Sequence, residues 1–571
     1  MIIAFFLFAH SWLAYLDSSL AYIGLTTKDI VFRSDYTICD PYRFSIVDYL
    51  LNNPLESIDF VISVQDVFWN SSEQEMFRNL VDLYDLRMEE KEDGFKKALQ
   101  ESHKLITQAF NETPQGLGKT FEELTLFSPE LTSSIEEDKE NEERGDSLVM
   151  FLKENGKKVD YSRLFTACSR LFVANQYHEA WFKKVKKRTQ QINGVQGAIL
   201  YYEQCDFGEI VVGDTGKNVY KKDFAVIIDL GGDDVYQFDV QRGKIHLLID
   251  ISGDDLYEGD NYSIACGNFG VSILIDEKGD DTYSAKNYSI GCGIFGVGIL
   301  IDREGNDRYF GDTFTEGAGG FGIGIIKDEA GNDVYEGALR AQGFASTYGV
   351  GILGDRDGND MYLILEKYTD EIRYLDHYLS LSQGFTAGFR PDLSAGIGII
   401  LEQSGNDYYL GDIFAQGSSY WYGIGAIVDD KGNDNYVAYQ YVQGAGTHIA
   451  IGVLVDKQGN DNYVAKGVSQ GCGHDLSLGL LYDIKGDDSY VAYDLSQGAG
   501  NANGVGILID ESGNDTYSVK KTHNTQGYGD SRREYGSIGV LLDIKGEDFF
   551  RSGTDKTLWK KGECGIGIDW E

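Results

Sequence analysis

The sequence predicts a mostly β protein: a right-handed parallel β-helix (solenoid) of about 12 coils, preceded by an N-terminal α-helical domain. Three observations support this prediction. An eight-residue motif recurs at nearly constant spacing beyond residue 195, and apolar residues follow a helical period before it. The glycine content changes at the same boundary, because 7 of the 70 glycines lie in residues 1–195 and 63 lie beyond them. We therefore expect a helical domain over residues 22–195 and a solenoid over residues 196–571.

The charge of the chain narrows the class of partner. The sequence has 91 acidic and 50 basic residues, a formal net charge of −41, divided into −9 over residues 1–195 and −32 beyond them. Such a field repels phosphate, which excludes a nucleic-acid partner, and it favours divalent cations. Aromatic residues make up 13% of the chain, which argues against disorder.

The first 21 residues have two interpretations. From Met1 to Leu16 there is no Asp, Glu, Lys or Arg, and Ser19-Leu20-Ala21 fits a small-x-small cleavage site. This predicts a secretory signal peptide and an extracellular, cell-surface or periplasmic location. The alternative is a buried N-terminal helix, favoured by the absence of Lys or Arg before the apolar run. No later run reaches 18 apolar residues, so no transmembrane segment is expected in the mature chain.

Helical signals in residues 22–195 are sparse. Ser72-Glu73-Gln74-Glu75 fits a capping box and begins a helical pattern that runs to about Asn111. Further patterns run from Ser147 to Asn155 and from Tyr161 to Gln191, and the acidic run Glu136–Asp146 reads as a solvated loop. No chemistry is evident in this region.

The repeat is Asp-x-x-Gly-Asn/Asp-Asp-x-Tyr. Its lead position falls at Asp229, Asp250, Asp276, Asp302, Asp328, Asp355, Glu402, Asp429, Asp456, Asp483, Asp510 and Asp543. Its sixth position is always Asp, at Asp234, Asp255, Asp281, Asp307, Asp333, Asp360, Asp407, Asp434, Asp461, Asp488, Asp515 and Asp548. Most intervals are 26 or 27 residues, with one of 21, one of 33 and one of 47.

A unit of this length, with two short strands and a turn, cannot bury its own apolar face, and stacking in register solves the problem. Propeller blades need about 40 residues, so a parallel β-helix remains. In the strand Gly504–Ile509, Val505 and Ile507 lie on one face and Gly506 on the other. We expect the motif glycine to supply a positive φ. We also expect the helical region to cover the first coil near Tyr202–Tyr220, because an open β-edge templates aggregation.

The Gly-Asn-Asp-x-Tyr string resembles the repeats-in-toxin type of calcium-binding β-roll and, more loosely, bacterial surface repeats. The resemblance covers Gly232 to Asp548. It implies calcium at the turns. The sequence departs from that family in its period of 26–27 rather than 9 or 18, and in carrying one motif per coil.

The aspartates themselves support calcium. In register, each carboxylate lies about 5 Å from its counterpart in the next coil, and each repulsion costs about 1 kcal/mol in water and more when buried. Calcium, which accepts six to eight oxygen ligands, relieves this repulsion. The predicted ligands are Asp276, Asp281, Asp302, Asp307, Asp328, Asp333, Asp429, Asp434, Asp456, Asp461, Asp483, Asp488, Asp510 and Asp515. The alternative is that these side chains only cap turns, which the frequent Asn at position five also suits.

Other columns have structural interpretations. The eighth-position tyrosines predict an aromatic ladder, with a sugar-stacking stripe as the alternative. The Gln-Gly pairs, such as Gln443 and Gln470, predict an amide ladder along the axis. Cys266 and Cys292 occupy equivalent positions of neighbouring coils. They are either small apolar side chains that fill space or partners in a disulfide bond.

Two function classes follow. The first is a secreted or cell-surface structural or binding repeat protein, with surface polysaccharide or protein as candidate partners. The alternative is a polysaccharide lyase or glycoside hydrolase using the insertion at residues 363–395 in the 47-residue unit. That insertion supplies Asp370, Glu371, Arg373, Asp376, His377 and Arg390, beside the lead Glu402.

Overall fold

The computed structural model describes residues 10–32, 40–127, 139–532, 535–551 and 557–570. The described chain is mostly β: a β-solenoid of about twelve turns follows a region of eight helices, as the sequence predicts. It divides into two compact units, described separately below. Unit 1 includes Val67–Gly343 and Gly349–Arg356, and unit 2 includes Ala4–Asp66, Phe344–Tyr348 and Asp357–Glu571.

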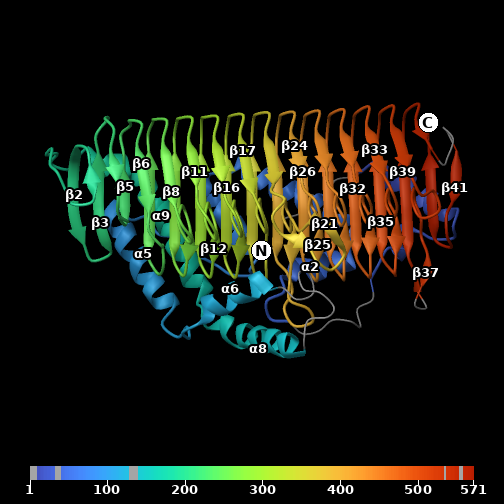
Figure 1. The fold of residues 1–571 in the computed structure, drawn as a ribbon, viewed down its shortest axis with the longest axis horizontal. Helices are drawn as coiled ribbons and strands as arrows, with labels where there is room; N and C mark the ends of the chain where they lie inside the picture. The colour runs from blue at the N-terminus through green and yellow to red at the C-terminus, as the bar shows by residue number, and fades with distance from the viewer. Residues whose placement is uncertain (1–9, 33–39, 128–138, 533–534, 552–556, 571) are drawn as a thin grey trace. The chain divides into compact units, whose positions relative to one another are not determined.

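A long-strand sheet runs through the coils of each unit (Figure 1). In unit 1 it contains β2 (Ile199–Cys205), β3 (Gly208–Gly213), β5 (Val226–Ile228), β7 (Ile245–Asp250), β10 (Val271–Asp276), β13 (Val297–Asp302), β16 (Ile323–Asp328) and β18 (Val350–Asp355). In unit 2 it contains β23 (Ile397–Glu402), β26 (Ile424–Asp429), β29 (Ile451–Asp456), β32 (Leu478–Asp483), β35 (Val505–Asp510), β39 (Ile538–Asp543), β42 (Gly565–Asp569) and β41 (Leu558–Lys560). From β3 to β18 and from β23 to β42, successive long strands are parallel and in register, so that Asp302 aligns with Asp328 and Asp456 with Asp483, whereas β2 and β41 pair antiparallel with their neighbours.

A second sheet, the tyrosine sheet, carries the motif tyrosines. In unit 1 it contains β1 (Val195–Gln196), β4 (Val219–Tyr220), β6 (Val235–Phe238), β8 (Leu256–Gly259), β11 (Thr282–Ser284), β14 (Arg308–Phe310) and β17 (Val334–Gly337). In unit 2 it contains β19 (Met361–Ile364), β24 (Tyr408–Leu410), β27 (Asn435–Val437), β30 (Asn462–Val464), β33 (Ser489–Ala492), β36 (Thr516–Val519) and β40 (Phe549–Phe550).

Most coils also have a two-residue third strand, which the sequence did not predict. These strands are β9 (Gly267–Asn268), β12 (Gly293–Ile294) and β15 (Gly319–Gly320) in unit 1, and β22 (Thr386–Ala387), β25 (Ser419–Tyr420), β28 (Gly446–Thr447), β31 (Gly473–His474) and β34 (Gly500–Asn501) in unit 2. Two antiparallel hairpins project from unit 2, formed by β20 (Thr369–Asp370) with β21 (Tyr374–Tyr378) and by β37 (Ser531–Arg532) with β38 (Tyr535–Gly536).

The long strands are buried on both faces, which explains their nearly continuous apolar sequence. One face points into the coil, where a Cβ on Gly298 would lie 2.1 Å from the carbonyl oxygen of Cys292. Glycine at this position therefore lets the third side of the coil approach the long strand closely. The opposite face lies under helices, and a Cβ on Gly354 would lie 2.3 Å from the ring of Phe68.

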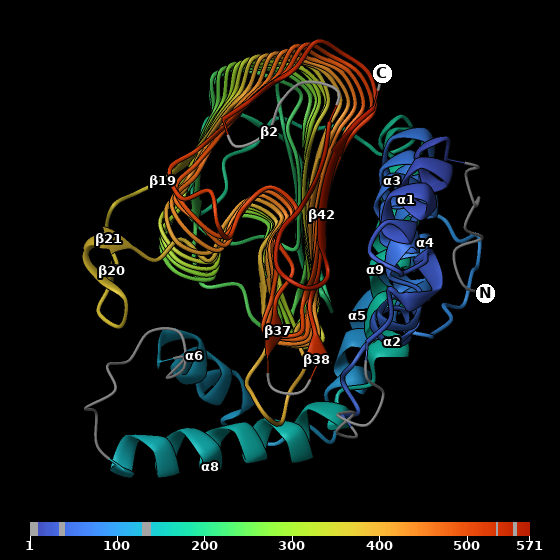
Figure 2. The ribbon, with the colours of Figure 1, turned by 90° about the vertical axis from the view of Figure 1, so that its right-hand side faces the viewer.

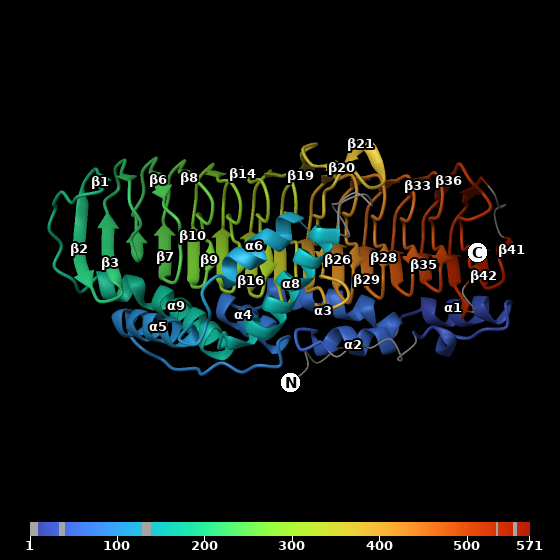
Figure 3. The ribbon, with the colours of Figure 1, turned by 60° about the horizontal axis from the view of Figure 1, so that its bottom comes forward.

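Helices line this outer face of the long-strand sheet in each unit (Figure 2). They are α1 (Trp12–Ala21), α2 (Ser45–Asn52), α3 (Ser57–Asn70), α4 (Glu73–Asp82), α5 (Phe95–Ala109) and α9 (Tyr161–Phe182), and the division between units falls within α3. Helices α6 (Leu117–Phe127) and α8 (Lys139–Asn155) lie away from this face, and Phe121 of α6 packs against Phe295 and Phe321 of the coils. In unit 1, Tyr84 donates a hydrogen bond to the Gly322 carbonyl (3.0 Å). In unit 2, α1 lies beside β42 (Figure 3), and the buried ring of Trp12 meets Tyr482.

The helical predictions for residues 22–195 are partly correct. The capping-box helix is α4, but it ends at Asp82, and a separate helix, α5, continues the pattern. The run Glu136–Asp146 is not a loop throughout, because α8 begins at Lys139, while residues 136–138 lie outside the described residues. Of the candidate signal segment, residues 1–9 also lie outside them, and Trp12–Ala21 form helix α1 with buried Leu16 and Leu20.

The predicted helical cover over the first coil is wrong in its placement. The sheet starts with the antiparallel hairpin β2–β3, and β2 is its edge strand. Helices α5 and α9 run along the flank and reach this hairpin at one side, where Lys96 pairs with Glu203 and Trp181 packs edge-on against Tyr201. An antiparallel hairpin and flanking helices thus replace the expected cap.

Candidate metal centre

The lead and sixth positions lie on either side of one turn in every coil. The lead residue ends a long strand, as Asp276 ends β10, and the sixth residue precedes the tyrosine strand, as Asp281 precedes β11. Parallel register stacks each position into a column within each unit. All fourteen predicted ligands are buried in these columns.

Lead aspartates accept two kinds of hydrogen bond. In several of them, Oδ1 accepts from the backbone N–H two residues on, as Asp276 accepts from Lys278 at 2.9 Å, which forms the Asx turn expected from the sequence. Oδ2 accepts from the tyrosine hydroxyl of the preceding coil, as Asp302 accepts from Tyr283 at 2.6 Å, although Oδ1 of Asp302 has no hydrogen-bond partner. The tyrosine thereby fixes the orientation of the next coil's carboxylate.

The sixth aspartates form a ladder of hydrogen bonds from backbone N–H groups to Oδ1 atoms. The backbone N–H of Asp255 donates to Oδ1 of Asp281 (2.6 Å), and that of Asp281 donates to Oδ1 of Asp307 (2.6 Å). The second oxygen, Oδ2, is buried and has no hydrogen-bond partner in Asp255, Asp281 and Asp307. These side chains are 98–100% buried, so each unpartnered oxygen carries a substantial desolvation cost.

The two columns meet as groups of three carboxylates. Asp250, Asp255 and Asp276 each offer an oxygen, and these oxygens lie within 4.8 Å of one another. Asp276, Asp281 and Asp302 repeat the arrangement one coil later. These groups span two coils, because each joins the lead and sixth residues of one coil to the lead residue of the next. Further along unit 1 the composition changes, and the group of Asp307, Asp328 and Asp333 joins two sixth residues to one lead residue.

Burial and mutual repulsion shift the titration of these groups strongly. Burial, followed by the charges of Asp276 and Asp302, raises the pKa of Asp281 to about 11. Burial, followed by the charge of Asp250, raises the pKa of Asp255 to about 10. Without a counter-ion, the sixth carboxyls therefore hold protons near neutral pH.

Backbone oxygens add to each group at the motif glycine. A Cβ placed on Gly305 would lie 1.8 Å from the carbonyl oxygen of Gly279 and 2.5 and 2.7 Å from the two carboxyl oxygens of Asp307. The same convergence occurs at Gly459. The expected positive φ occurs at Gly232 (130°), Gly253 (158°) and Gly279 (157°) but not at Gly305 or Gly459, where the residue is required because no side chain fits.

The donor set suits a hard cation. Carboxylate and backbone carbonyl oxygens are the ligands calcium prefers, and calcium tolerates irregular geometry better than magnesium does. The groups set out above contain neither Cys nor His, which the softer transition metals favour. The turn-cap interpretation is also correct, since the same carboxylates accept backbone N–H bonds.

Sequence reasoning missed several members of this site. Asp229, Asp234, Asp250 and Asp255 form groups like the others, although they were left out of the predicted ligands. Their motif is complete, so the repeat itself was the available signal. The tyrosine hydroxyl and the glycine carbonyl were also missed, because their direction depends on how the turn folds.

Position five forms a separate, exposed ladder. Asn433 donates from Nδ2 to Oδ1 of Asn406 (2.8 Å), and Asn406 does the same to Asn359 (2.8 Å). An Asp there keeps only the backbone bond, as between Asp280 and Asp254 (3.1 Å). The preference for Asn is therefore a matter of turn structure.

The tyrosines form the predicted aromatic ladder. Tyr436 and Tyr463 are fully buried and stack with ring centroids 5.0 Å apart, so a sugar has no access to them. The glutamines do not bond to one another as predicted. Gln443 instead donates from Nε2 to the backbone carbonyls of Tyr436 (2.9 Å) and Val464 (3.2 Å). Cys266 and Cys292 are buried free thiols, without the disulfide.

The insertion of the 47-residue unit projects outward as the β20–β21 hairpin (Figure 2). Asp370 is buried and pairs with Arg373 (2.8 Å). His377 pairs with Asp412 (2.9 Å) and stacks on Tyr439. The remaining predicted residues, Glu371, Asp376 and Arg390, are exposed. The Asp370–Arg373 pair lies within the insertion, whereas the contacts of His377 hold the hairpin on the coil. Arg390 lies over the ring of Trp421.

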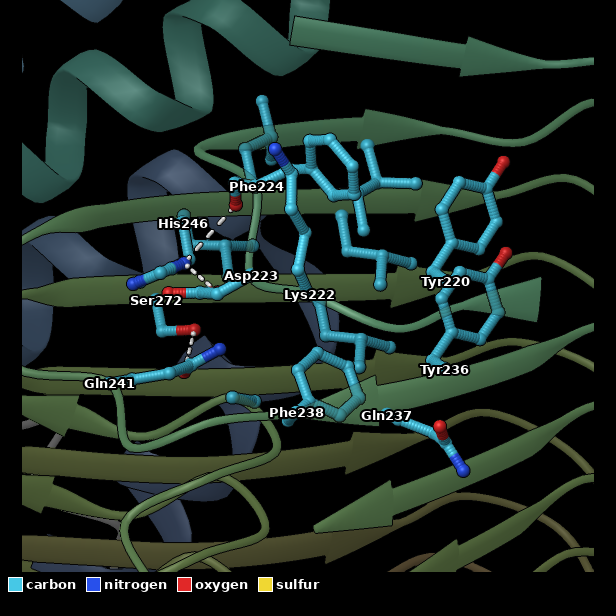
Figure 4. Close-up of a pocket in the computed structure, with 16 residues that line it drawn as sticks. Tyr220, Lys222, Asp223, Phe224, Tyr236, Gln237, Phe238, Gln241, His246 and Ser272 are labelled. Carbon is cyan, nitrogen blue, oxygen red and sulfur yellow. Dashed lines mark hydrogen bonds and ion pairs between the residues drawn. The ribbon is translucent and has the colours of Figure 1, made fainter. Parts of the chain in front are cut away.

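A small, partly open pocket of about 20 Å³ lies in unit 1, at the coil shortened to 21 residues (Figure 4). The coil has no third strand there, and Phe224, Phe238 and Gln241 fill part of the space. His246 lies at its edge and pairs with Asp223 (3.0 Å). The volume suits a single water molecule and is too small for an organic substrate.

Comparison with protein families, with curated proteins and with solved structures finds no match to this chain. Among the helices that the structure describes, none combines the length and the apolar character needed to cross a membrane.

Proposed function

We propose that this chain is a structural or binding repeat protein whose β-solenoid is stabilised by calcium ions bound at the turn aspartates. One observation carries the proposal: neighbouring coils bring together groups of three buried carboxylates, such as Asp250, Asp255 and Asp276, that include an unpartnered oxygen. Asp255 supplies that oxygen between Asp250 and Asp276.

The chemistry of burial supports a cation. An unpaired carboxylate in a protein interior costs several kcal/mol, and a row of them repels itself. Protons relieve part of this cost, as the raised pKa of Asp281 indicates. A divalent ion relieves more, because it neutralises two carboxylates and uses the unpartnered oxygens as ligands.

This role fits a location where calcium is abundant. Sites in extracellular modules bind calcium at about 10⁻⁴–10⁻³ M. We therefore extend the proposal to a secreted or cell-surface protein, in which the exposed turns and the hairpin face polysaccharide or protein partners. Hydrolysis or lyase activity at residues 363–395 stays a prediction of the sequence alone.

Calorimetric titration of the full chain with calcium tests the proposal. We expect binding and a melting temperature that rises with calcium by mass action, with about 3 kcal/mol gained at a hundredfold excess over Kd. The double variant Asp456→Asn/Asp461→Asn should lose bound calcium and most of the local stabilisation.

A matched control variant distinguishes the loss of a calcium site from a mere loss of net negative charge. Asp254→Asn/Asp280→Asn removes the same two charges from the exposed position-five ladder and should bind as the wild type does. The proposal is overturned if chelator leaves the melting curve unchanged and calorimetry finds no binding at millimolar calcium. It is also overturned if both double variants lose calcium equally, since the effect is then one of net charge.

A further inference from the structure

Neighbouring carboxylate groups share a residue. Asp276 belongs to the group with Asp250 and Asp255 and also to the group with Asp281 and Asp302. Asp250 is shared in the same way, with Asp229 and Asp234 on its other side. Among these first three groups, a sixth aspartate such as Asp255 belongs to one group and a lead aspartate between two groups belongs to both.

The hydrogen bonds explain how one lead carboxylate serves two coils. Tyr257 of the preceding coil bonds to Oδ2 of Asp276, while Lys278 of its own turn bonds to Oδ1. One oxygen of this carboxylate is thus bonded to the preceding coil and the other to its own turn. Asp281 instead accepts the ladder bond at Oδ1 from the backbone N–H of Asp255, and its Oδ2 has no hydrogen-bond partner.

Charge balance agrees with sharing. In the run from Asp229 to Asp302, each group contains one sixth aspartate and two lead aspartates, and Asp250 and Asp276 are each divided between two groups. The middle group of this run therefore carries two negative charges, which one divalent ion neutralises. A row of separate sites with three carboxylates each would leave a surplus charge in every coil.

We infer that the cations between Asp229 and Asp302 form a single shared file, in which each ion lies between two consecutive coils and the lead residues Asp250 and Asp276 are each a ligand of two successive ions. This inference rests on the proposed calcium binding and specifies its stoichiometry and coupling. Each ion then links two consecutive coils, so replacing one shared lead aspartate removes two of these links.

Counting ions on single variants of the full chain tests the file. Native mass spectrometry in calcium should show that Asp276→Asn loses two ions relative to wild type. Asp281→Asn and Asp255→Asn should each lose one, and the double variant Asp255→Asn/Asp281→Asn should match Asp276→Asn. All are isosteric changes at buried positions of unit 1.

A second shared residue offers the same test if the first variant does not fold. If Asp276→Asn does not fold, Asp250→Asn tests the same sharing at the next step and should also lose two ions. Equal losses for lead and sixth variants overturn the file while leaving calcium binding intact. A wild-type chain that binds no calcium overturns the proposed function itself, so the two failures are distinguishable.

Discussion

At the scale of single residues, the motif works through backbone atoms as much as through carboxylates. The glycine has no room for a side chain, because the carbonyl of the preceding coil's glycine and the sixth aspartate surround the place of its Cβ, as they do at Gly305. Glycine thus brings carbonyl and carboxyl oxygens together at one point. Position four is glycine in every coil for this steric reason, which links the fold to the candidate site.

Replacing Gly305 by alanine should therefore destabilise the coil. The Cβ would overlap the Gly279 carbonyl at 1.8 Å, which only a backbone shift relieves, so we expect a loss of about 2–3 kcal/mol. The control is Gly216→Ala, whose nearest atom is 3.5 Å away and which should change stability by less than about 0.5 kcal/mol. Urea unfolding followed by circular dichroism measures both, and equal effects would contradict the steric account.

At the scale of elements, the repeat made the solenoid predictable, while the helices were predictable only in part. The two faces of Gly504–Ile509 could be assigned from alternation, but both are buried, and the continuous apolar run was the signal for a covering layer. Where that layer lies depends on contacts between residues far apart, such as Tyr84 with Gly322. The spacing of apolar residues within one segment does not predict such contacts.

The candidate site was likewise predictable only in part from the sequence. The identity and period of the aspartates place their columns, so the predicted ligands lie where the sequence puts them. The direction of Oδ2 in Asp281 depends on the turn and on the neighbouring coil, and the third strand is too short to have a pattern of its own. A motif therefore predicts which residues meet, whereas the backbone determines which atoms do.

Helix α6 offers a test of how a covering helix is held. Phe121 is completely buried and packs edge-on against Phe295, Phe314 and Phe321 of the coils. Phe121→Ala should cost about 3–5 kcal/mol at this contact. We expect local release of α6, because the coils keep their own hydrogen bonds.

Hydrogen exchange resolves this outcome by segment. Amides of α6 should lose protection in Phe121→Ala while those of β13 and β16 stay protected. Met150→Ala, at a side chain of α8 that is 42% exposed, serves as the control and should leave the pattern unchanged. Loss of protection throughout the coils would mean that the helix and the solenoid fold as one cooperative element.

At the scale of the whole molecule, the formal charge of −41 counts every buried carboxyl as ionised. Each coil buries two of them about 5 Å from the next pair, which the folded chain tolerates only with protons or cations in the columns. The same acidic columns therefore have a protonated form in the absence of calcium and an ion-bound form in its presence. Stability should depend on pH in opposite ways in these two forms.

The calcium-free chain should lose stability as pH rises. The sixth aspartates have folded pKa values above the unfolded value of about 3.9, with Asp488 raised to about 8 and Asp255 to about 10, first of all by burial. A raised folded pKa means that the folded state holds the proton more tightly, so its contribution is complete below about pH 4 and is lost as pH passes through about 8 to 10. In chelator, the melting temperature should fall between about pH 5.5 and pH 9. In saturating calcium the trend should flatten or reverse, because the ion must displace these protons and binds more tightly as they leave. Melting curves at the two pH values, with and without calcium, measure all four combinations. A calcium-free melting temperature that rises toward pH 9 would show that the buried carboxyls are ionised and compensated without either protons or ions.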